Sequence, residues 1–110
     1  MAQGTIIRGT TPTLEFKINS TLDLNEVAEI WITFKTKASA NPKKKTYTIE
    51  DVDVDVANSK VILVLTQEDT LAFSESAVQI QIRLRMNDDM AYASEIIEET
   101  IGKILEDGVI

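Results

Sequence analysis

Residues 78–86 read Val-Gln-Ile-Gln-Ile-Arg-Leu-Arg-Met, an alternation of apolar and polar side chains without a break. Successive side chains of a β-strand point to opposite faces of the sheet, so this period of two predicts a strand with one buried face. A helix would scatter the same apolar residues around its whole circumference. We therefore expect Ile80, Ile82 and Leu84 in a core, with Arg83 and Arg85 facing solvent or a partner.

The remaining chain divides into further segments with strand patterns, separated by turn signals. Residues 61–65 are apolar throughout and predict a strand that is buried on both faces, apart from its ends. Residues 96–105 fit either a helical stripe or a strand; their β-branched residues and Gly102 favour a strand. The predicted strands, about seven, are 14–18, 30–35, 45–49, 52–56, 61–65, 78–86 and 96–105. This pattern predicts an all-β fold, an antiparallel two-sheet sandwich.

The segments between these strands carry their own signals. Residues 39–42 and 87–89 predict hairpin turns, and Leu22 and Leu24 are expected to tuck under the connection 19–26. The apolar positions change parity after residue 49, which predicts a bulge or turn near residues 50–51. Thr66 is a candidate N-cap for one helical turn over residues 66–73, although Asp69 stands where a capping box prefers Glu or Gln.

Length and composition describe one globular domain, residues 1–110, with an ordinary hydrophobic content of 44%. The chain has no Cys and no His, which excludes disulfides, the usual zinc ligands and the common catalytic triads. The start of the chain shows no secretory signal, and its longest apolar run, 61–65, is too short for a membrane span. We expect a protein without cofactor, metal or catalytic residues.

The net charge of −7 argues against nucleic acid as a partner. The charge is uneven: residues 1–49 hold seven Lys or Arg and four Asp or Glu, a balance of +3, and residues 50–110 hold four and fourteen, a balance of −10. Copies of the chain are able to associate through such an asymmetry. The acidic part also suggests a nucleic-acid mimic, which predicts carboxylates clustered on one surface.

Acidic residues occur in two arrangements that resemble known sites, a calcium loop and a hydrolase carboxylate pair. Asp51, Asp53 and Asp55 resemble a calcium loop, but Val56 and Ile62 stand where such a loop needs Gly and Glu. The alternation with valine favours a solvated strand face. Adjacent carboxylates such as Glu98 and Glu99 point to opposite faces of a strand and do not form a hydrolase pair.

Three groups of residues are candidates for an interface. Trp31 lies opposite three apolar neighbours on its predicted strand and is either an exposed binding anchor or a residue packed between the sheets. Lys43, Lys44 and Lys45 form a basic run that either solvates a loop or meets an acidic partner. Val109 and Ile110 are apolar and are expected to dock on their own sheet or on a neighbour.

Four stretches together resemble small prophage proteins related to the N-terminal domain of the phage baseplate upper protein. They are 8–16 (Arg-Gly-Thr-Thr-Pro-Thr-Leu-Glu-Phe), 65–73 (Leu-Thr-Gln-Glu-Asp-Thr-Leu-Ala-Phe), 78–86, and 102–110 (Gly-Lys-Ile-Leu-Glu-Asp-Gly-Val-Ile). The resemblance implies an immunoglobulin-like sandwich that anchors other components in a tail or baseplate. It implies synthesis in a bacterial cytoplasm, assembly into the virion tail, and no catalytic residues.

The expected function is thus a non-catalytic structural or adaptor module of a phage or prophage tail, acting through protein–protein docking. Its expected partners are other tail or baseplate proteins, a second copy of the chain included, and neither nucleic acid nor membrane. The alternative is a carbohydrate- or peptide-binding module, for which Trp31 or Tyr92 would supply the exposed aromatic ring.

Overall fold

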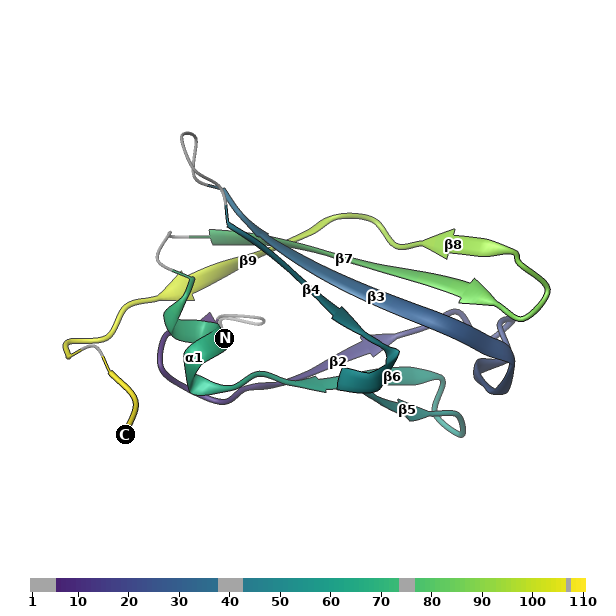
Figure 1. The fold of residues 1–110 in the computed structure, drawn as a ribbon, viewed down its shortest axis with the longest axis horizontal. Coiled ribbons are helices and arrows are strands. Elements are labelled where there is room, and N and C mark those ends of the chain that lie inside the picture. Colours follow the sequence, from purple (N-terminus) through teal and green to yellow (C-terminus); the bar gives the residue numbers. More distant parts are fainter. Residues whose placement is uncertain (1–5, 38–42, 74–76, 107) are drawn as a thin grey trace.

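A computed structural model describes residues 6–37, 43–73, 77–106 and 108–110, which form a mostly β protein of two facing sheets (Figure 1). The expected all-β class is confirmed. Two strands beyond the predicted seven, β1 and β8, are present among the described residues. The strands are β1 (Ile6–Ile7), β2 (Thr13–Lys17), β3 (Val27–Thr36), β4 (Lys44–Thr48), β5 (Asp53–Asp55), β6 (Lys60–Val64), β7 (Ala77–Met86), β8 (Ala91–Ala93) and β9 (Ile97–Gly102).

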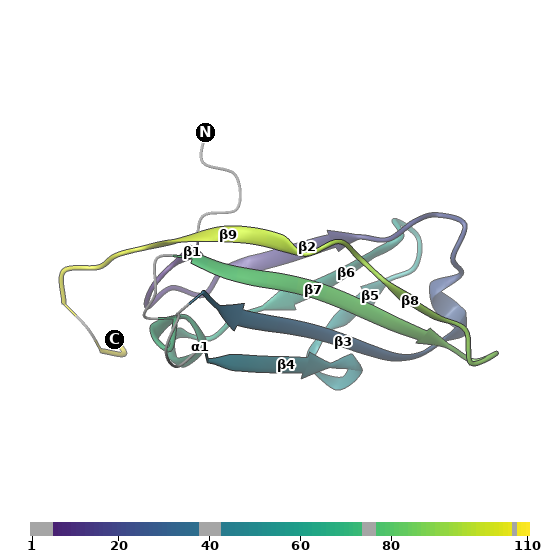
Figure 2. The same ribbon diagram turned by 90° about the horizontal axis from the view of Figure 1, so that it is seen from above.

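The larger sheet has the strand order β1-β9-β7-β3-β4, and β8 also pairs with β7 (Figure 2). Its central pair is β3 with β7, which run antiparallel with Ile32 opposite Ile82. The alternation predicted for 78–86 is confirmed, because Val78, Ile80, Ile82, Leu84 and Met86 are all buried. The turn predicted at 87–89 is confirmed by the β7–β8 hairpin, which the Met86 N–H closes by donating to the Met90 carbonyl at 2.8 Å.

The smaller sheet has the order β2-β6-β5 and covers the inner face of the larger one. Val61, Leu63 and Leu65 are buried between the sheets, but Val64 is 55% exposed. The expectation that residues 61–65 are buried on both faces is therefore wrong. Among the described residues no layer covers the outer face of this sheet, so the apolar run is buried on one face only, although β6 is the central strand of its sheet.

Aromatic rings and aliphatic side chains fill the space between the sheets. Phe34 is fully buried and lies 5.5 Å from the ring of Tyr47, edge to face, and 5.6 Å from the ring of Phe73, stacked. Such pairs add to the stabilisation from burial of apolar area. Leu24 is buried and Leu22 is half-buried, which confirms that both tuck under the connection between β2 and β3.

Three short helical turns join the strands: η1 (Leu24–Glu26), η2 (Ile49–Asp51) and α1 (Gln67–Leu71). The predicted turn near residues 50–51 is η2, and it accounts for the change of parity. Thr66 caps α1 as predicted. Its hydroxyl accepts from the Asp69 N–H at 3.1 Å, and Asp69 Oδ2 accepts from the Thr66 N–H at 2.9 Å. Asp69 therefore completes the capping box, despite its shorter side chain.

The ambiguous segment 96–105 is a strand from Ile97 to Gly102, and the strand does not continue over residues 103–105. β9 pairs antiparallel with β7 and parallel with β1. A Cβ placed on Gly102 would lie 2.4 Å from Ile7 Cδ1, so a larger residue here would displace the end of the Ile7 side chain on β1. The strand interpretation is confirmed for 97–102 and wrong for the residues that follow. The predicted turn at 39–42 lies outside the described residues.

Candidate functional site

Trp31 lies in the middle of β3, on the outer face of the larger sheet. Its neighbours Ile30 and Ile32 are completely buried, and Trp31 itself is 46% exposed. The alternation of the strand explains the difference, because three apolar side chains of β3 fill the core and turn the indole outward. Of the two interpretations open from the sequence, the exposed one is confirmed.

The neighbours of Trp31 leave one side of the indole open. Arg83 stands directly opposite on β7, and its guanidinium carbon lies 5.9 Å from the indole centroid, within cation–π range. Beyond β7, Ala91 and Ala93 of β8 add only methyl groups to this face. A shallow hollow of about 220 Å³ beside the ring is lined by Glu29, Trp31, Arg83, Leu84, Arg85 and Ala91. We call Trp31, Arg83, Arg85 and Ala91 the Trp31 face.

The carboxylate in this hollow, that of Glu29, has a structural role. Glu29 Oε1 accepts hydrogen bonds from the N–H of Ile30 at 3.0 Å and from the N–H of Ile49 at 3.3 Å, which ties β3 to η2. Arg85 lies 3.5 Å from Asp89 in an exposed pair, which salt and solvent weaken. The Trp31 face therefore offers a flat aromatic ring beside the Arg83 guanidinium, with Arg85 two residues further along β7, which suits an acidic surface or the polar face of a peptide.

The three predicted lysines are all exposed, but Lys44 and Lys45 point to opposite faces of β4. Lys44 stands opposite Lys35 in the larger sheet. Lys45 Nζ lies 3.2 Å from Asp69 Oδ1 and 5.1 Å from the ring centroid of Tyr47. Burial and the charge of Asp69 raise the pKa of the Tyr47 phenol, so it stays protonated. The lysine run thus does not form one basic patch.

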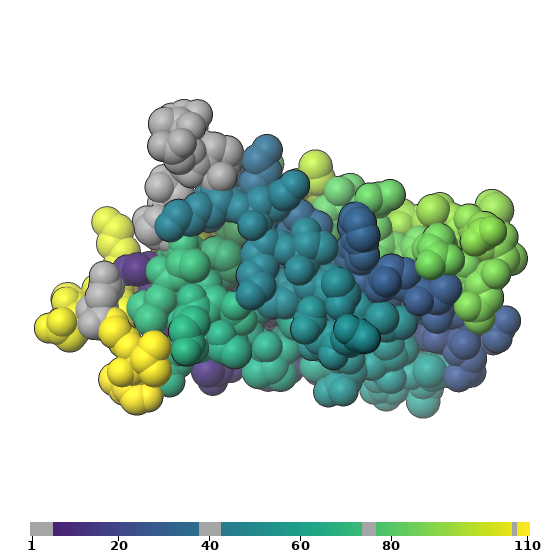
Figure 3. All heavy atoms as spheres, viewed as in Figure 1, coloured from purple at the N-terminus to yellow at the C-terminus, as the bar shows by residue number. Residues whose placement is uncertain are grey.

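The C-terminal pair is held by its main chain. The Ile110 N–H donates to Gln67 Oε1 at 2.8 Å, and Gln67 Nε2 donates to the Ile110 carbonyl at 3.2 Å. The Val109 and Ile110 side chains remain exposed, at the end of the molecule where α1 lies (Figure 3). Docking is therefore to α1 through the backbone, and not to a sheet through the apolar side chains.

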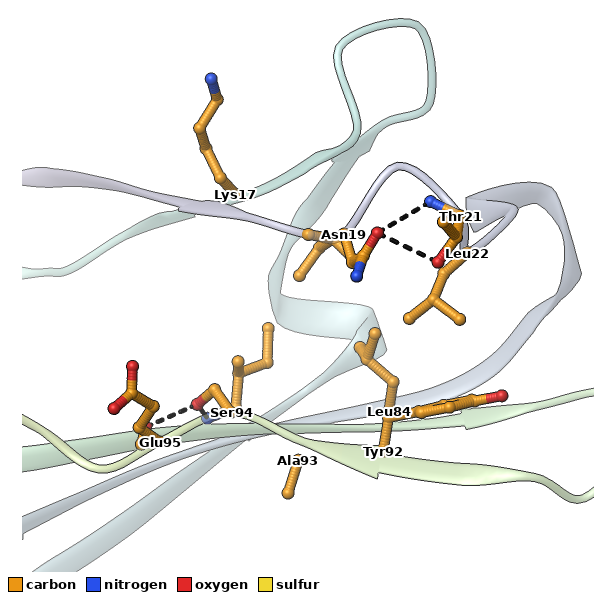
Figure 4. A pocket seen from close by; sticks show the side chains of 11 residues that line it. Lys17, Asn19, Thr21, Leu22, Leu84, Tyr92, Ala93, Ser94 and Glu95 are labelled. Carbon is orange, nitrogen blue, oxygen red and sulfur yellow. Dashed lines mark hydrogen bonds between the residues drawn. The ribbon is translucent and has the colours of Figure 1, made fainter.

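Sequence reasoning did not find a cleft of about 560 Å³ between the two layers, where the end of β2 faces β7 and β8 (Figure 4). Leu22 and Leu84 point toward one another across it, and Lys17 points away. The register of β8 indicates that Tyr92 belongs to the inner face, because Tyr92 stands opposite Leu84. The cleft is lined by Lys17, Ile18, Asn19, Thr21, Leu22, Ile82, Leu84, Tyr92, Ala93, Ser94 and Glu95.

The aspartates that resemble a calcium loop serve local structure. Asp55 accepts from the Asn58 backbone at 3.2 Å and from the Asn58 side chain at 2.9 Å, and these bonds lower the pKa of Asp55. Asp51 Oδ2 accepts from the Thr48 N–H at 2.9 Å. Among the described residues, no group of three or more potential ligands is arranged to hold a metal ion.

The carboxylates do not gather on one surface. Among the described residues, ion pairs occur on both sheets: Lys60 with Glu15 on the smaller sheet, and Lys37 with Glu98 and Arg85 with Asp89 on the larger. Carboxylates thus occur on both sheets, and these three are paired with basic side chains, unlike the unbroken negative charge of a nucleic acid.

None of the helices in the described part of the chain is long and apolar enough to cross a membrane. No family model and no curated protein matches this sequence.

Proposed function

We propose that this chain is a non-catalytic docking module of a phage or prophage tail, built as an immunoglobulin-like sandwich that binds another tail protein through the Trp31 face. The strand order β1-β9-β7-β3-β4 over β2-β6-β5 supports the sandwich type. It corresponds to strands A′, G, F, C and C′ over B, E and D of the variable immunoglobulin arrangement. The tail role rests on the resemblance carried by residues 8–16, 65–73, 78–86 and 102–110.

The observation that carries the docking role is the exposure of Trp31 on the central strand of a rigid sheet. An indole 46% exposed beside a guanidinium combines the two residue types that dominate binding energy at protein interfaces. The sheet fixes both side chains before binding, which lowers the entropy lost on association. The two arginines favour a partner whose contact surface carries Asp or Glu.

Binding to purified phage tail and baseplate proteins tests the proposal. Each candidate partner is passed over the immobilised protein, and affinities are measured for wild type, Trp31→Ala and Val64→Ala. Val64 is the matched control, because it is an exposed apolar residue on the outer face of the other sheet. We expect Trp31→Ala to weaken binding by at least about thirtyfold, and Val64→Ala to leave it unchanged.

Two results would contradict the docking role. One is that no tail protein binds at tens of micromolar. The other is that Trp31→Ala binds as tightly as wild type, which would move the docking surface elsewhere.

The cleft favours a second function, a carbohydrate- or peptide-binding module. Its walls are mostly apolar, Tyr92 is 40% exposed, and Asn19, Thr21 and Ser94 supply polar groups. That composition is typical of small-ligand sites. Calorimetric titration with cell-wall glycan fragments and short peptides tests it, with Tyr92→Ala as the variant. Heat that Tyr92→Ala abolishes supports this function, and no heat with any of these ligands eliminates it.

A further inference from the structure

In the described part of the chain, β2 is an edge strand with one unpaired side. Among the described residues it pairs only with β6. The Ile18 N–H donates to the Ser59 carbonyl at 2.8 Å, and the Pro12 carbonyl accepts from the Leu65 N–H at 3.0 Å. Bonding groups alternate along an antiparallel strand, so the even-numbered residues bond to β6. The backbone groups of Thr13, Glu15 and Lys17 consequently point to the free side, where another strand is able to bind.

The apolar surface beside this edge is also incompletely covered. Leu14, Phe16 and Ile18 face the core but are only half-buried. In the larger sheet, β9 lies along the same side of the sandwich as β2 (Figure 2), and its Ile97 is 42% exposed although it stands opposite the buried Ile80. An open edge flanked by apolar side chains is the usual template for the addition of a strand.

The sequence of β2 selects the strand that fits. Residues 14–18 read Leu-Glu-Phe-Lys-Ile, so charge and hydrophobicity are complementary when the segment is reversed. Two copies that pair antiparallel must place odd-numbered residues opposite odd-numbered ones, because these carry the free backbone groups. A twofold axis at Glu15 or at Lys17 would set like charges opposite each other. An axis at Phe16 sets Glu15 opposite Lys17 twice, with Leu14 opposite Ile18.

We propose that two copies of this chain associate through β2, antiparallel about a twofold axis at Phe16, into a continuous six-stranded sheet. Glu15 then lies between Lys17 of the second copy and Lys60 of its own chain, whose Nζ is 3.1 Å from Glu15 Oε1. The contact is isologous and closes after two copies, so it forms dimers and not fibres. It leaves the Trp31 face free, and it holds whether or not the chain serves in a tail.

Charge exchange tests this register directly. Sedimentation velocity at several protein concentrations is measured for wild type, Glu15→Lys, Lys17→Glu and the double variant. We expect wild type to dimerise, and each single variant to raise the dimer dissociation constant at least about tenfold. The double variant should restore dimerisation, and an equimolar mixture of the two single variants should form a heterodimer, since the mixture and the double variant both place opposite charges across the axis.

Circular dichroism confirms that each variant is folded. Lys17→Glu retains the Glu15–Lys60 pair, so it reports on association even if Glu15→Lys unfolds. A wild type that stays monomeric at about 100 µM overturns the proposal. So does a dimer that survives Lys17→Glu, or a double variant that remains monomeric while folded. A monomeric wild type that still binds a tail protein through Trp31 would overturn the dimer and leave the docking function standing.

Discussion

Phe34 and Trp31 of β3 have opposite environments, although both side chains are large and aromatic. Phe34 is completely buried against Tyr47 and Phe73, and Trp31 is nearly half exposed beside Arg83. The difference comes from the parity of the strand alone. Residue type is therefore a poor guide to burial here, and position along the strand is a good one.

Truncation at these two positions should separate stability from binding. Phe34→Ala removes a ring from a closed core and should lower the free energy of unfolding by about 3–5 kcal/mol. Trp31→Ala empties no core space and should lower it by less than about 1 kcal/mol. Urea unfolding followed by circular dichroism measures both. Equal losses in the two variants would show that Trp31 supports the core.

Glu99 is a carboxylate on the core-facing side of its strand, the side that also carries the buried Ile101. Glu99 lies in β9, opposite the buried Val78 of β7. Burial raises the pKa of Glu99. A raised folded-state pKa means that the folded protein holds this proton to higher pH than the unfolded chain, so ionisation costs stability as pH rises. Glu99→Gln should therefore stabilise the protein at neutral pH, and the gain should shrink as pH falls toward 4. Thermal unfolding across that range measures it, and a destabilised variant at pH 7 would contradict the assignment.

At the scale of elements, α1 is a five-residue helix that depends on its cap. Burial disfavours the charge of Asp69, but hydrogen bonds from Thr66 and Lys45 outweigh it and lower the pKa of Asp69. Asp69 thus joins the helix start to β4 through Lys45 at 3.2 Å. α1 is consequently fastened to the larger sheet by the Lys45–Asp69 pair, by Arg8 beside β1, whose Nη2 donates to the Leu71 carbonyl at 2.8 Å, and by the packing of Phe73.

Substitution of this cap should have a pH-dependent effect. Asp69→Asn should lower the free energy of unfolding by about 1 kcal/mol at neutral pH. A depressed folded-state pKa gives stability above the unfolded-state pKa that is lost as pH falls through the folded-state value. The difference between wild type and variant should therefore vanish in acid. Thermal melts from pH 7 to pH 3 measure it, and a constant difference would mean that the charge of Asp69 plays no part.

At the scale of the whole molecule, the proposed interfaces lie on different surfaces. The described residues span 46 × 29 × 27 Å, with the Trp31 face on the outer side of the larger sheet and the β2 edge at the side of the smaller one. A dimer through β2 leaves both copies of Trp31 accessible. Such a dimer would present two docking faces to a symmetric assembly, which strengthens binding by multivalency.

This geometry predicts that association does not shield the indole. Acrylamide quenching of Trp31, the single tryptophan, should be equal for wild type at a dimer-forming concentration and for Lys17→Glu at the same concentration. Stronger quenching of Lys17→Glu would mean that copies associate over the Trp31 face instead of β2.

The strand pattern could be predicted because a β-strand's period of two is a property of local backbone geometry. The core faces of β3 and β7, the cap at Thr66 and the hairpin after Met86 followed from neighbouring residues alone. The prediction failed at Val64 and beyond Gly102, where burial depends on whether another layer covers the segment. The cleft was missed for the same reason, since its walls come from β2, the connection that follows β2, β7, and β8 with the residues after it.

The alternation in the sequence thus decided which residues share a face of each strand. It placed Trp31 on the face opposite the core residues of β3. Only the three-dimensional arrangement decided that the indole remains 46% exposed, that the described part of the chain leaves one side of β2 unpaired, and that Leu22 and Leu84 point toward one another across a cleft. The physical reason is range. Alternation arises between adjacent peptide units, whereas strand neighbours and edges arise from contacts between residues far apart in the chain.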